Sequence, residues 1–212
     1  MKIEKVKFSN INSLAGEYEI DFTHKSLSTA GMFLITGPTG SGKTTIMDAI
    51  CLALYARTPR QTKAITKDRN EIMTRGASGF YAEAWFQHGG KRYHCQARQN
   101  ISVRGSNPFG EFSHTVAEIL PNGDKCVIEQ KKGAREATQV NQITGISFNN
   151  FKRSVMLAQG EFDAFLKAGV DEKSAALEAI TGTEIYHHIG ISAHKKTSEL
   201  KQRKNQYPIL MG

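Results

Sequence analysis

The stretch ITGPTGSGKTTIMDAI, residues 35–50, decides the fold of this chain. It places three glycines, a proline and a lysine directly before a run whose apolar residues recur at helical spacing. From Gly37 to Thr44 it matches the pattern G-x-x-x-x-G-K-[ST] at every fixed position. Glycine lets such a loop curl, so that successive backbone N–H groups point at one polyphosphate. The stretch therefore predicts a P-loop that opens a helix.

Each part of this loop has a chemical role in that interpretation. The start of the helix offers unpaired N–H groups and a positive dipole end to phosphates. Lys43 adds a full charge for the β- and γ-phosphates, Thr44 supplies a hydroxyl for Mg²⁺, and Thr45 can reach another phosphate oxygen. We therefore expect ATP and Mg²⁺ as ligands, and a glycine-rich turn that merely caps a helix is the alternative. The predicted nucleotide-binding residues of the loop are Gly37, Pro38, Thr39, Gly40, Ser41, Gly42, Lys43, Thr44 and Thr45.

The flanking regions favour phosphate binding over a simple cap. Residues 31–37 form a nearly continuous apolar run, which is typical of a strand covered on both faces. Residues 43–56 carry apolar side chains at helical spacing, and Thr58-Pro59 ends the predicted helix, because the residue before proline avoids helical geometry. Alternating residues in 1–8 and 17–22 predict a hairpin before the loop.

The rest of the chain divides into a β-rich block, from 80 to 130, and a mostly helical part. Two hairpins are predicted in the block, with turns at 88–90 and 121–124. Residues 60–79 are expected to form a long loop. The other predicted elements are a helix at 134–144, a short strand within 153–162, helices near 160–168 and 171–181, and a helix-compatible, lysine-rich tail at 183–207.

Composition narrows the class of protein. The chain has 212 residues, of which 39% are hydrophobic, enough for one sizeable core. No apolar run approaches the roughly 18 residues of a membrane span, and the N-terminus lacks a signal-peptide core. Three scattered cysteines predict reduced thiols and a cytoplasmic protein. A net charge of +8 favours an anionic partner, either nucleic acid or a membrane surface.

Binding a nucleotide differs from hydrolysing it. Hydrolysis needs a group that orients water and usually a second carboxylate near the metal. In P-loop proteins that carboxylate follows four hydrophobic residues, and no such run follows Thr44. The chain is therefore expected to hold half of a hydrolytic site.

The chain also resembles the N-terminal region of the SbcC family, the ATPase subunits of bacterial SbcCD nucleases in the SMC-like branch of ABC ATPases. The resemblance runs from Met1 to about Tyr186 and implies an ABC/SMC-type α/β P-loop fold. Residues 1–182 would be an N-terminal lobe with a mixed sheet, inserted antiparallel hairpins and flanking helices, and residues 183–212 would begin a coiled coil. The segments that carry it are FSNINSLAGEYEIDF, FLITGPTGSGKTTIMDAICLALYARTPR, IMTRGA, FKRSVMLAQGEFDAFLKA and LEAITGTEIY.

The resemblance assigns further site residues. Gln159 in LAQGEF matches the family's glutamine, which contacts Mg²⁺ and senses the γ-phosphate, so Lys43 and Gln159 become the catalytic candidates and Thr44 and Gln159 the metal ligands. Some relatives carry an arginine in the first loop near the phosphates. This chain has Asn12 there, which could bond a phosphate without supplying charge. The adenine contacts stay open, with Asn10 and Met73 as candidates.

The resemblance also implies partners. The expected protein partners are the C-terminal lobe of the full-length chain, a second head joined through ATP and an SbcD-like nuclease subunit. Double-stranded DNA would be bound without sequence preference. No membrane partner is expected, and the protein would be located in the cytoplasm, at the nucleoid. Basic residues near the loop and the hairpins are the DNA candidates: Lys63, Lys67, Arg69, Arg75, Arg92, Arg98, Arg104, Lys131, Lys132 and Arg135. Those of the tail would belong to the root of the coiled coil: Lys195, Lys196, Lys201, Arg203 and Lys204.

Two other functions compete with this interpretation. A small P-loop phosphotransferase of the nucleoside kinase type would transfer phosphate as an isolated chain. A nucleotide-gated interaction module would bind without catalysis. Measured turnover of the isolated chain, and the sequence beyond residue 212, would separate them.

Overall fold

The computed structural model describes residues 1–29, 34–60, 64–102, 108–133, 137–152, 169 and 184–206. The chain forms two compact units, Met1–Phe148 and Asn149–Gly212. In the described part, no helix is long and apolar enough to cross a membrane.

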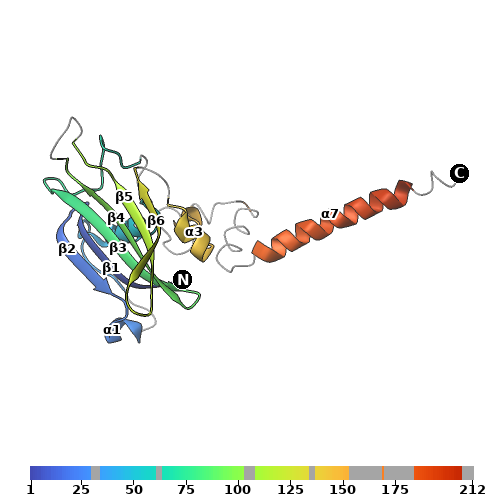
Figure 1. The fold of residues 1–212 in the computed structure, drawn as a ribbon, viewed down its shortest axis with the longest axis horizontal. Helices are drawn as coiled ribbons and strands as arrows, with labels where there is room; N and C mark the ends of the chain where they lie inside the picture. The colour runs from blue at the N-terminus through green and yellow to red at the C-terminus, as the bar shows by residue number, and fades with distance from the viewer. Residues whose placement is uncertain are drawn as a thin grey trace. The chain divides into compact units, whose positions relative to one another are not determined.

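The first unit is built on a six-stranded antiparallel sheet with the strand order β2-β1-β3-β4-β5-β6 (Figure 1). The hairpins predicted around the turns at 88–90 and 121–124 are confirmed as β3–β4 and β5–β6. The strands are β1 (Lys2–Ile11), β2 (Leu14–Asp21), β3 (Gly79–His88), β4 (Lys91–Asn100), β5 (Ser113–Ile119) and β6 (Lys125–Lys132).

Local sequence explains the tight connections. Gly89 and Gly90 have φ values of 57° and 77°, and a two-residue hairpin turn of this kind needs positive φ at both positions. Between β5 and β6 the register shifts at Val116/Ala117, which is a β-bulge. The bulge leaves Ile128 of β6 as the extra residue.

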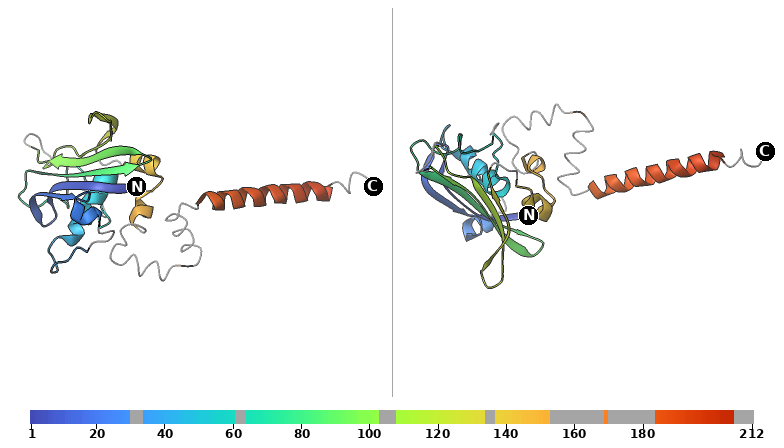
Figure 2. Two further views of the ribbon diagram at one scale, coloured as in Figure 1. Left: turned by 90° about the horizontal axis from the view of Figure 1, so that it is seen from below. Right: turned by 45° about the horizontal axis from the view of Figure 1, so that its top comes forward.

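Helix α2 (Lys43–Tyr55) packs across one face of the sheet, against β1, β3 and β4 (Figure 2). The alternation of the strands turns Phe8 and Phe86 to this face, where both are buried. The small Ala82 and Ala84 of β3 are fully buried, so they leave room for the helix to approach the sheet closely. This packing fixes the start of α2, and with it the loop that precedes the helix.

Besides α2, the described part of the chain contains short helices and the longer α7. The helix predicted at 134–144 is α3 (Gln139–Thr144), which Gly145 ends with a φ of 72°; residues 134–136 lie outside the described part. The others are α1 (Lys25–Ser28), α4 (Phe148–Asn150) and α7 (Glu184–Gln206). The side chains from 189 to 203 of α7 are exposed.

The strand predicted at 31–37 is wrong for the residues that the structure describes. Residues 34–37 have no strand structure, and Leu34 is 84% exposed. A strand that is covered on both faces needs neighbouring strands in its sheet. No described strand pairs with residues 34–37. The sheet is consequently antiparallel throughout the described part, where the resemblance implied a mixed one.

Several predicted elements lie outside the described residues. They are the strand within 153–162, the helices near 160–168 and 171–181, and the expected domain boundary at 182/183.

Candidate functional site

A cavity of about 420 Å³ opens at the N-terminal end of α2. Three parts of the chain meet there: the P-loop, the turn between β1 and β2, and the segment that follows α2. The lining residues are Asn12, Ser13, Gly40, Gly42, Lys43, Thr44, Thr45, Asp48, Thr58, Arg60, Glu71 and Ile72.

The glycines of the loop are required by its backbone. Gly40 and Gly42 have φ values of 83° and 89°, a region that other residues enter at a cost. Gly42 is also the N-cap of α2, and a Cβ there would lie 2.7 Å from Cδ2 of Leu14. The first residue of β2 therefore sits directly on the P-loop.

Lys43 is folded back onto its own loop. Its Nζ donates to the carbonyl oxygens of Gly37 and Pro38 at 2.7 Å each, and to Oγ of Ser41 at 3.4 Å. Gly37, Pro38, Thr39 and Ser41 build the loop without lining the cavity. The other predicted residues of the loop do line it, so the structure brings the cation and the hydroxyl groups together.

The donor set of the cavity suits a hard cation. Thr44 and Glu71 line the cavity and carry oxygen donors, while Oδ2 of Asp48 is already engaged by Asn12 and Arg60, so the available candidate ligands are oxygens. Among the described residues, no cluster of three or more His, Cys, Asp or Glu could hold a metal by itself. Mg²⁺ thus fits the site if a bound nucleotide completes its shell.

Asn12 is held inside a small polar network. Its Nδ2 donates to Oδ2 of Asp48 at 2.9 Å and, at the long limit of 3.5 Å, to Oγ1 of Thr45. Its backbone N–H donates to the Ile72 carbonyl at 2.6 Å. Both hydrogens of the side-chain amide are therefore engaged within the protein. Asn12 lines the cavity without bringing charge.

The same network contains two residues that sequence reasoning missed. Asp48 is buried, and its Oδ2 accepts a hydrogen bond from a terminal guanidinium nitrogen of Arg60. Two signals could have found the pair. An aspartate within the apolar run of a helix needs a partner when it is buried. Arg60 directly follows the Thr58-Pro59 helix stop, where the chain turns back.

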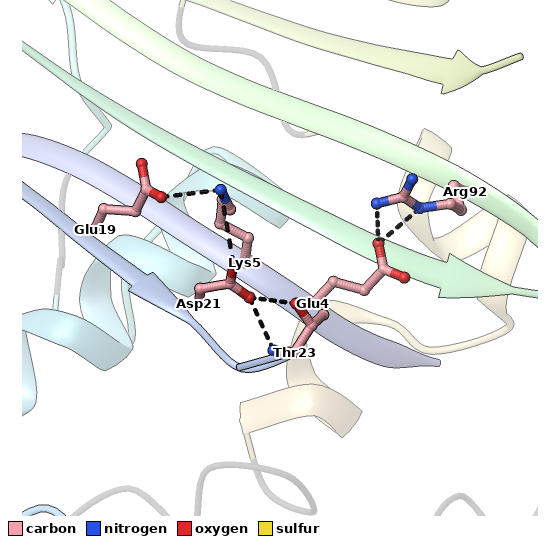
Figure 3. Close-up of polar contacts among 6 residues, drawn as sticks. All are labelled: Glu4, Lys5, Glu19, Asp21, Thr23 and Arg92. Atoms are coloured by element: carbon pink, nitrogen blue, oxygen red, sulfur yellow. Dashed lines mark hydrogen bonds and ion pairs between the residues drawn. The ribbon is translucent and has the colours of Figure 1, made fainter. Parts of the chain in front are cut away.

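Arg92, one of the DNA candidates, is already neutralised. Its guanidinium forms an ion pair with the carboxylate of Glu4 at 2.8 Å (Figure 3). Lys131 is likewise paired with Glu129 at 3.1 Å. Each cation has a carboxylate beside it, so neither offers a free charge to a phosphate.

Beside Arg92, Figure 3 shows a second neutralised cluster on β1 and β2. Lys5 Nζ lies 2.9 Å from Glu19 and 3.9 Å from Asp21. The hydroxyl of Thr23 donates to Asp21 at 2.6 Å, and this bond is the main reason why the pKa of Asp21 is lowered. The charges on this face of the sheet are thus largely balanced by one another.

The remaining basic candidates differ from these. Arg69 donates to the carbonyl of Ala64 at 3.5 Å. In the described part of the chain, no carboxylate forms an ion pair with Lys67, Arg75, Arg98 or Lys132. Lys195, Lys196, Lys201 and Arg203 are exposed on α7. Lys63, Arg104, Arg135 and the metal candidate Gln159 lie outside the described residues, as does the side chain of Lys204.

The two candidate adenine contacts do not line the cavity. Asn10 bridges the backbone instead, since its Nδ2 donates to the Gly79 carbonyl at 2.9 Å and its Oδ1 accepts from Gly16 N–H at 2.8 Å. The neighbour of Met73, Ile72, does line it.

Comparisons with known proteins agree with the P-loop geometry. Residues 5–209 match the family described as AAA domain. The SbcC component of the SbcCD nuclease from Pseudomonas aeruginosa is 37% identical over 97% of this chain and 18% of the relative. The corresponding proteins of Rhodobacter capsulatus and Clostridium acetobutylicum are 36% and 30% identical, over 93% and 100% of this chain and 17% of each relative.

These relatives confirm the resemblance to SbcC, and the chain spans less than a fifth of their length. Since the family match covers almost every residue and the cavity at α2 is lined by its P-loop, the chain belongs to the AAA domain family.

Proposed function

We propose that this chain is the ATP-binding, N-terminal part of an SbcC-type ATPase that acts with a nuclease subunit on DNA. The observation that carries the proposal is the position of Lys43, whose ammonium group is held at the N-terminal end of α2, beside a cavity of about 420 Å³. A helix N-terminus and a lysine beside it form a binding site for phosphate groups.

The chemistry of binding follows from the contacts of the loop. On arrival of ATP, Lys43 exchanges the carbonyl oxygens of Gly37 and Pro38 for β- and γ-phosphate oxygens, which bind an ammonium more strongly. Thr44 would hold Mg²⁺ through its hydroxyl group. Gln159 is the proposed amide ligand that completes the site. The metal would neutralise charge that develops during phosphoryl transfer.

Exposed apolar side chains before the P-loop support the ABC/SMC-type architecture. Leu34 is 84% exposed and Ile35 37% exposed, although their sequence is typical of a buried strand. A C-terminal lobe of the full-length chain would cover them and supply the acidic strand motif. Two such heads would join through ATP, each completing the other's site.

The DNA and nuclease partners belong to the same proposal. The relatives are named as one component of the SbcCD nuclease, which implies a separate nuclease subunit. Lys67, Arg75, Arg98 and Lys132 are the cations proposed to contact DNA, because they lack a described carboxylate partner. Such contacts would be independent of sequence and sensitive to salt, and they would place the protein at the cytoplasmic nucleoid.

A stand-alone phosphotransferase is not favoured. The chain is similar along nearly its whole length to proteins named as components of a nuclease. A non-catalytic nucleotide-gated module would bind ATP as well as the proposed ATPase does. Phosphate release from MgATP by the full-length protein distinguishes the ATPase from such a module.

Titration of the chain with a fluorescent ATP analogue and Mg²⁺ tests nucleotide binding. We expect saturable binding that Lys43→Ala weakens about tenfold or more, as for a lost charge-assisted contact. Lys67→Ala is the matched control, since it removes an exposed lysine outside the cavity. Absent binding by the folded wild-type chain, or equal affinity of the Lys43→Ala variant, would contradict the proposal.

A further inference from the structure

The pair formed by Asp48 and Arg60 has no role in the P-loop motif, yet both residues line the P-loop cavity. We infer that Arg60 contacts the phosphates of the bound nucleotide, and that buried Asp48 is the residue that positions it. This inference rests on the proposed function and adds a second cationic contact to the same site.

The side chain of Arg60 is available to a ligand. It is 58% exposed, while that of Asp48 is 2% exposed, so the pair has one anchored end and one open end. A guanidinium has five N–H donors, and the bond to Asp48 uses one terminal nitrogen. The remaining donors form a planar fork that suits phosphate oxygens.

The carboxylate of Asp48 holds side chains from two segments of the site. Its Oδ2 accepts from Asn12, in the turn between β1 and β2, and from Arg60, after α2. Lys43 is bonded to the loop carbonyls instead. In the described part of the chain, Arg60 is therefore the cation that pairs with Asp48. A buried carboxylate needs such a partner, which fixes where the guanidinium lies.

The charge of the cavity favours a second cationic side chain. A triphosphate carries three to four negative charges, while Lys43 supplies one positive charge and the proposed Mg²⁺ would supply two. Asn12 brings none, and its amide hydrogens are already engaged. The carboxylates of Asp48 and Glu71 also line the cavity and oppose an anion. Arg60 offsets Asp48 while it presents its free donors to the phosphates.

The effect of Asp48→Asn separates this inference from simple electrostatics. The change removes a negative charge from the cavity, so electrostatics alone would tighten ATP binding. If Asp48 positions Arg60, the change weakens binding instead. We expect Arg60→Gln to weaken MgATP binding about tenfold or more, the loss typical of a charge-assisted contact. Arg60→Lys keeps the positive charge but lacks the planar set of guanidinium donors. We expect it to bind MgATP more tightly than Arg60→Gln and more weakly than the wild-type chain.

Coupling between the two residues gives the second readout. The double variant Asp48→Asn/Arg60→Gln should bind MgATP no more weakly than Arg60→Gln alone, because Asp48 acts through Arg60. Arg92→Gln is the matched control. It breaks the pair of Arg92 and Glu4 shown in Figure 3, whose side chains are 55% and 14% exposed. Neither residue lines the cavity. We expect it to leave MgATP affinity unchanged, and thermal unfolding of every variant checks the fold.

The outcomes distinguish this inference from the proposed function. If Lys43→Ala abolishes binding and Arg60→Gln does not change it, the inference is wrong and ATP binding stands. If Asp48→Asn tightens binding, its positioning role is wrong. If Arg60→Gln weakens binding to duplex DNA and leaves ATP binding unchanged, Arg60 is a DNA contact and the inference fails. Should Asp48→Asn fail to fold, the comparison of Arg60→Gln, Arg60→Lys and Arg92→Gln still decides.

Discussion

At Gly42 two separate constraints act on one residue. Its φ of 89° favours glycine, and a Cβ would lie within 2.8 Å of three carbon atoms of the Leu14 side chain. Gly40, two residues earlier, has a similar φ of 83°, but a Cβ there would meet nothing within 4 Å. The pair therefore allows the backbone cost and the contact cost to be measured apart.

We expect Gly40→Ala to lower the free energy of unfolding by about 1–2 kcal/mol, the cost of a left-handed backbone at alanine. Gly42→Ala should cost about 1–3 kcal/mol more, because Leu14 must move. Urea denaturation of both variants checks this. Equal losses would contradict the contact with Leu14. A Leu14→Ala change in the Gly42→Ala background should remove the extra cost in a double-mutant cycle.

Individual residues also differ in how well the sequence alone could predict their place in the site. The P-loop residues could be predicted because their function depends on spacing along the chain. Asp48 and Arg60 could not be paired in that way, because their contact depends on how the chain returns after Thr58-Pro59. Asn12 was placed at the site through the resemblance alone. Its use as a donor to Asp48 follows only from the fold.

At the scale of elements, His114 ties β5 to α2. Its Nε2 lies 2.7 Å from the Ala53 carbonyl oxygen, which can only accept, so Nε2 carries the proton. Its Nδ1 is buried without a hydrogen-bond partner among the described atoms. Burial lowers the pKa of His114, and the bond to Ala53 opposes this effect in part. The folded protein therefore favours the neutral imidazole.

Stability should consequently fall in mild acid. Above pH 6.5 the imidazole is neutral in both states, and below it the unfolded chain binds a proton that the folded chain resists. The free energy of unfolding should then decrease by at most about 1.4 kcal/mol per pH unit. Urea denaturation between pH 6.5 and about pH 5 measures this slope. His114→Gln should flatten it. An equal slope in the His114→Gln variant would contradict the assignment.

The strands could be predicted more fully than the helices. Alternating side chains and glycine turns are local signals, and they predicted the hairpins within 80–130. The run at 34–37 has a strand-like sequence, but pairing depends on neighbours that its own residues do not specify. Helix α3 begins at Gln139 rather than at 134, because helix ends depend on packing as well as on propensity.

At the scale of the whole molecule, binding and hydrolysis should separate. The proposed phosphate cradle lies in the described cavity, and the proposed acidic strand motif belongs to another lobe. We expect the isolated chain to release phosphate from MgATP no faster than its Lys43→Ala variant, although it binds the nucleotide. A phosphate-release assay under saturating MgATP checks this. Robust turnover that Lys43→Ala abolishes would contradict the half-site and favour an autonomous enzyme.

The division of the chain stays a prediction at this scale. The structure separates Met1–Phe148 from Asn149–Gly212, and the boundary expected at 182/183 lies outside the described residues. Sequence could anticipate a helical tail, which α7 confirms, because helix propensity is local. It could not show whether the exposed Ile189 and Leu200 meet a second helix, since such pairing depends on residues elsewhere.

The β-bulge at the end of the sheet has a consequence for self-association. β6 is the last strand, so its outer backbone groups have no partner strand in the described part and resemble the growing end of a fibril. Lys125 and Lys132 lie along it, and the bulge at Ile128 interrupts its regular repeat. Two copies brought edge to edge would face like charges and mismatched ladders. These features oppose amyloid-like stacking, although Val127 is 58% exposed.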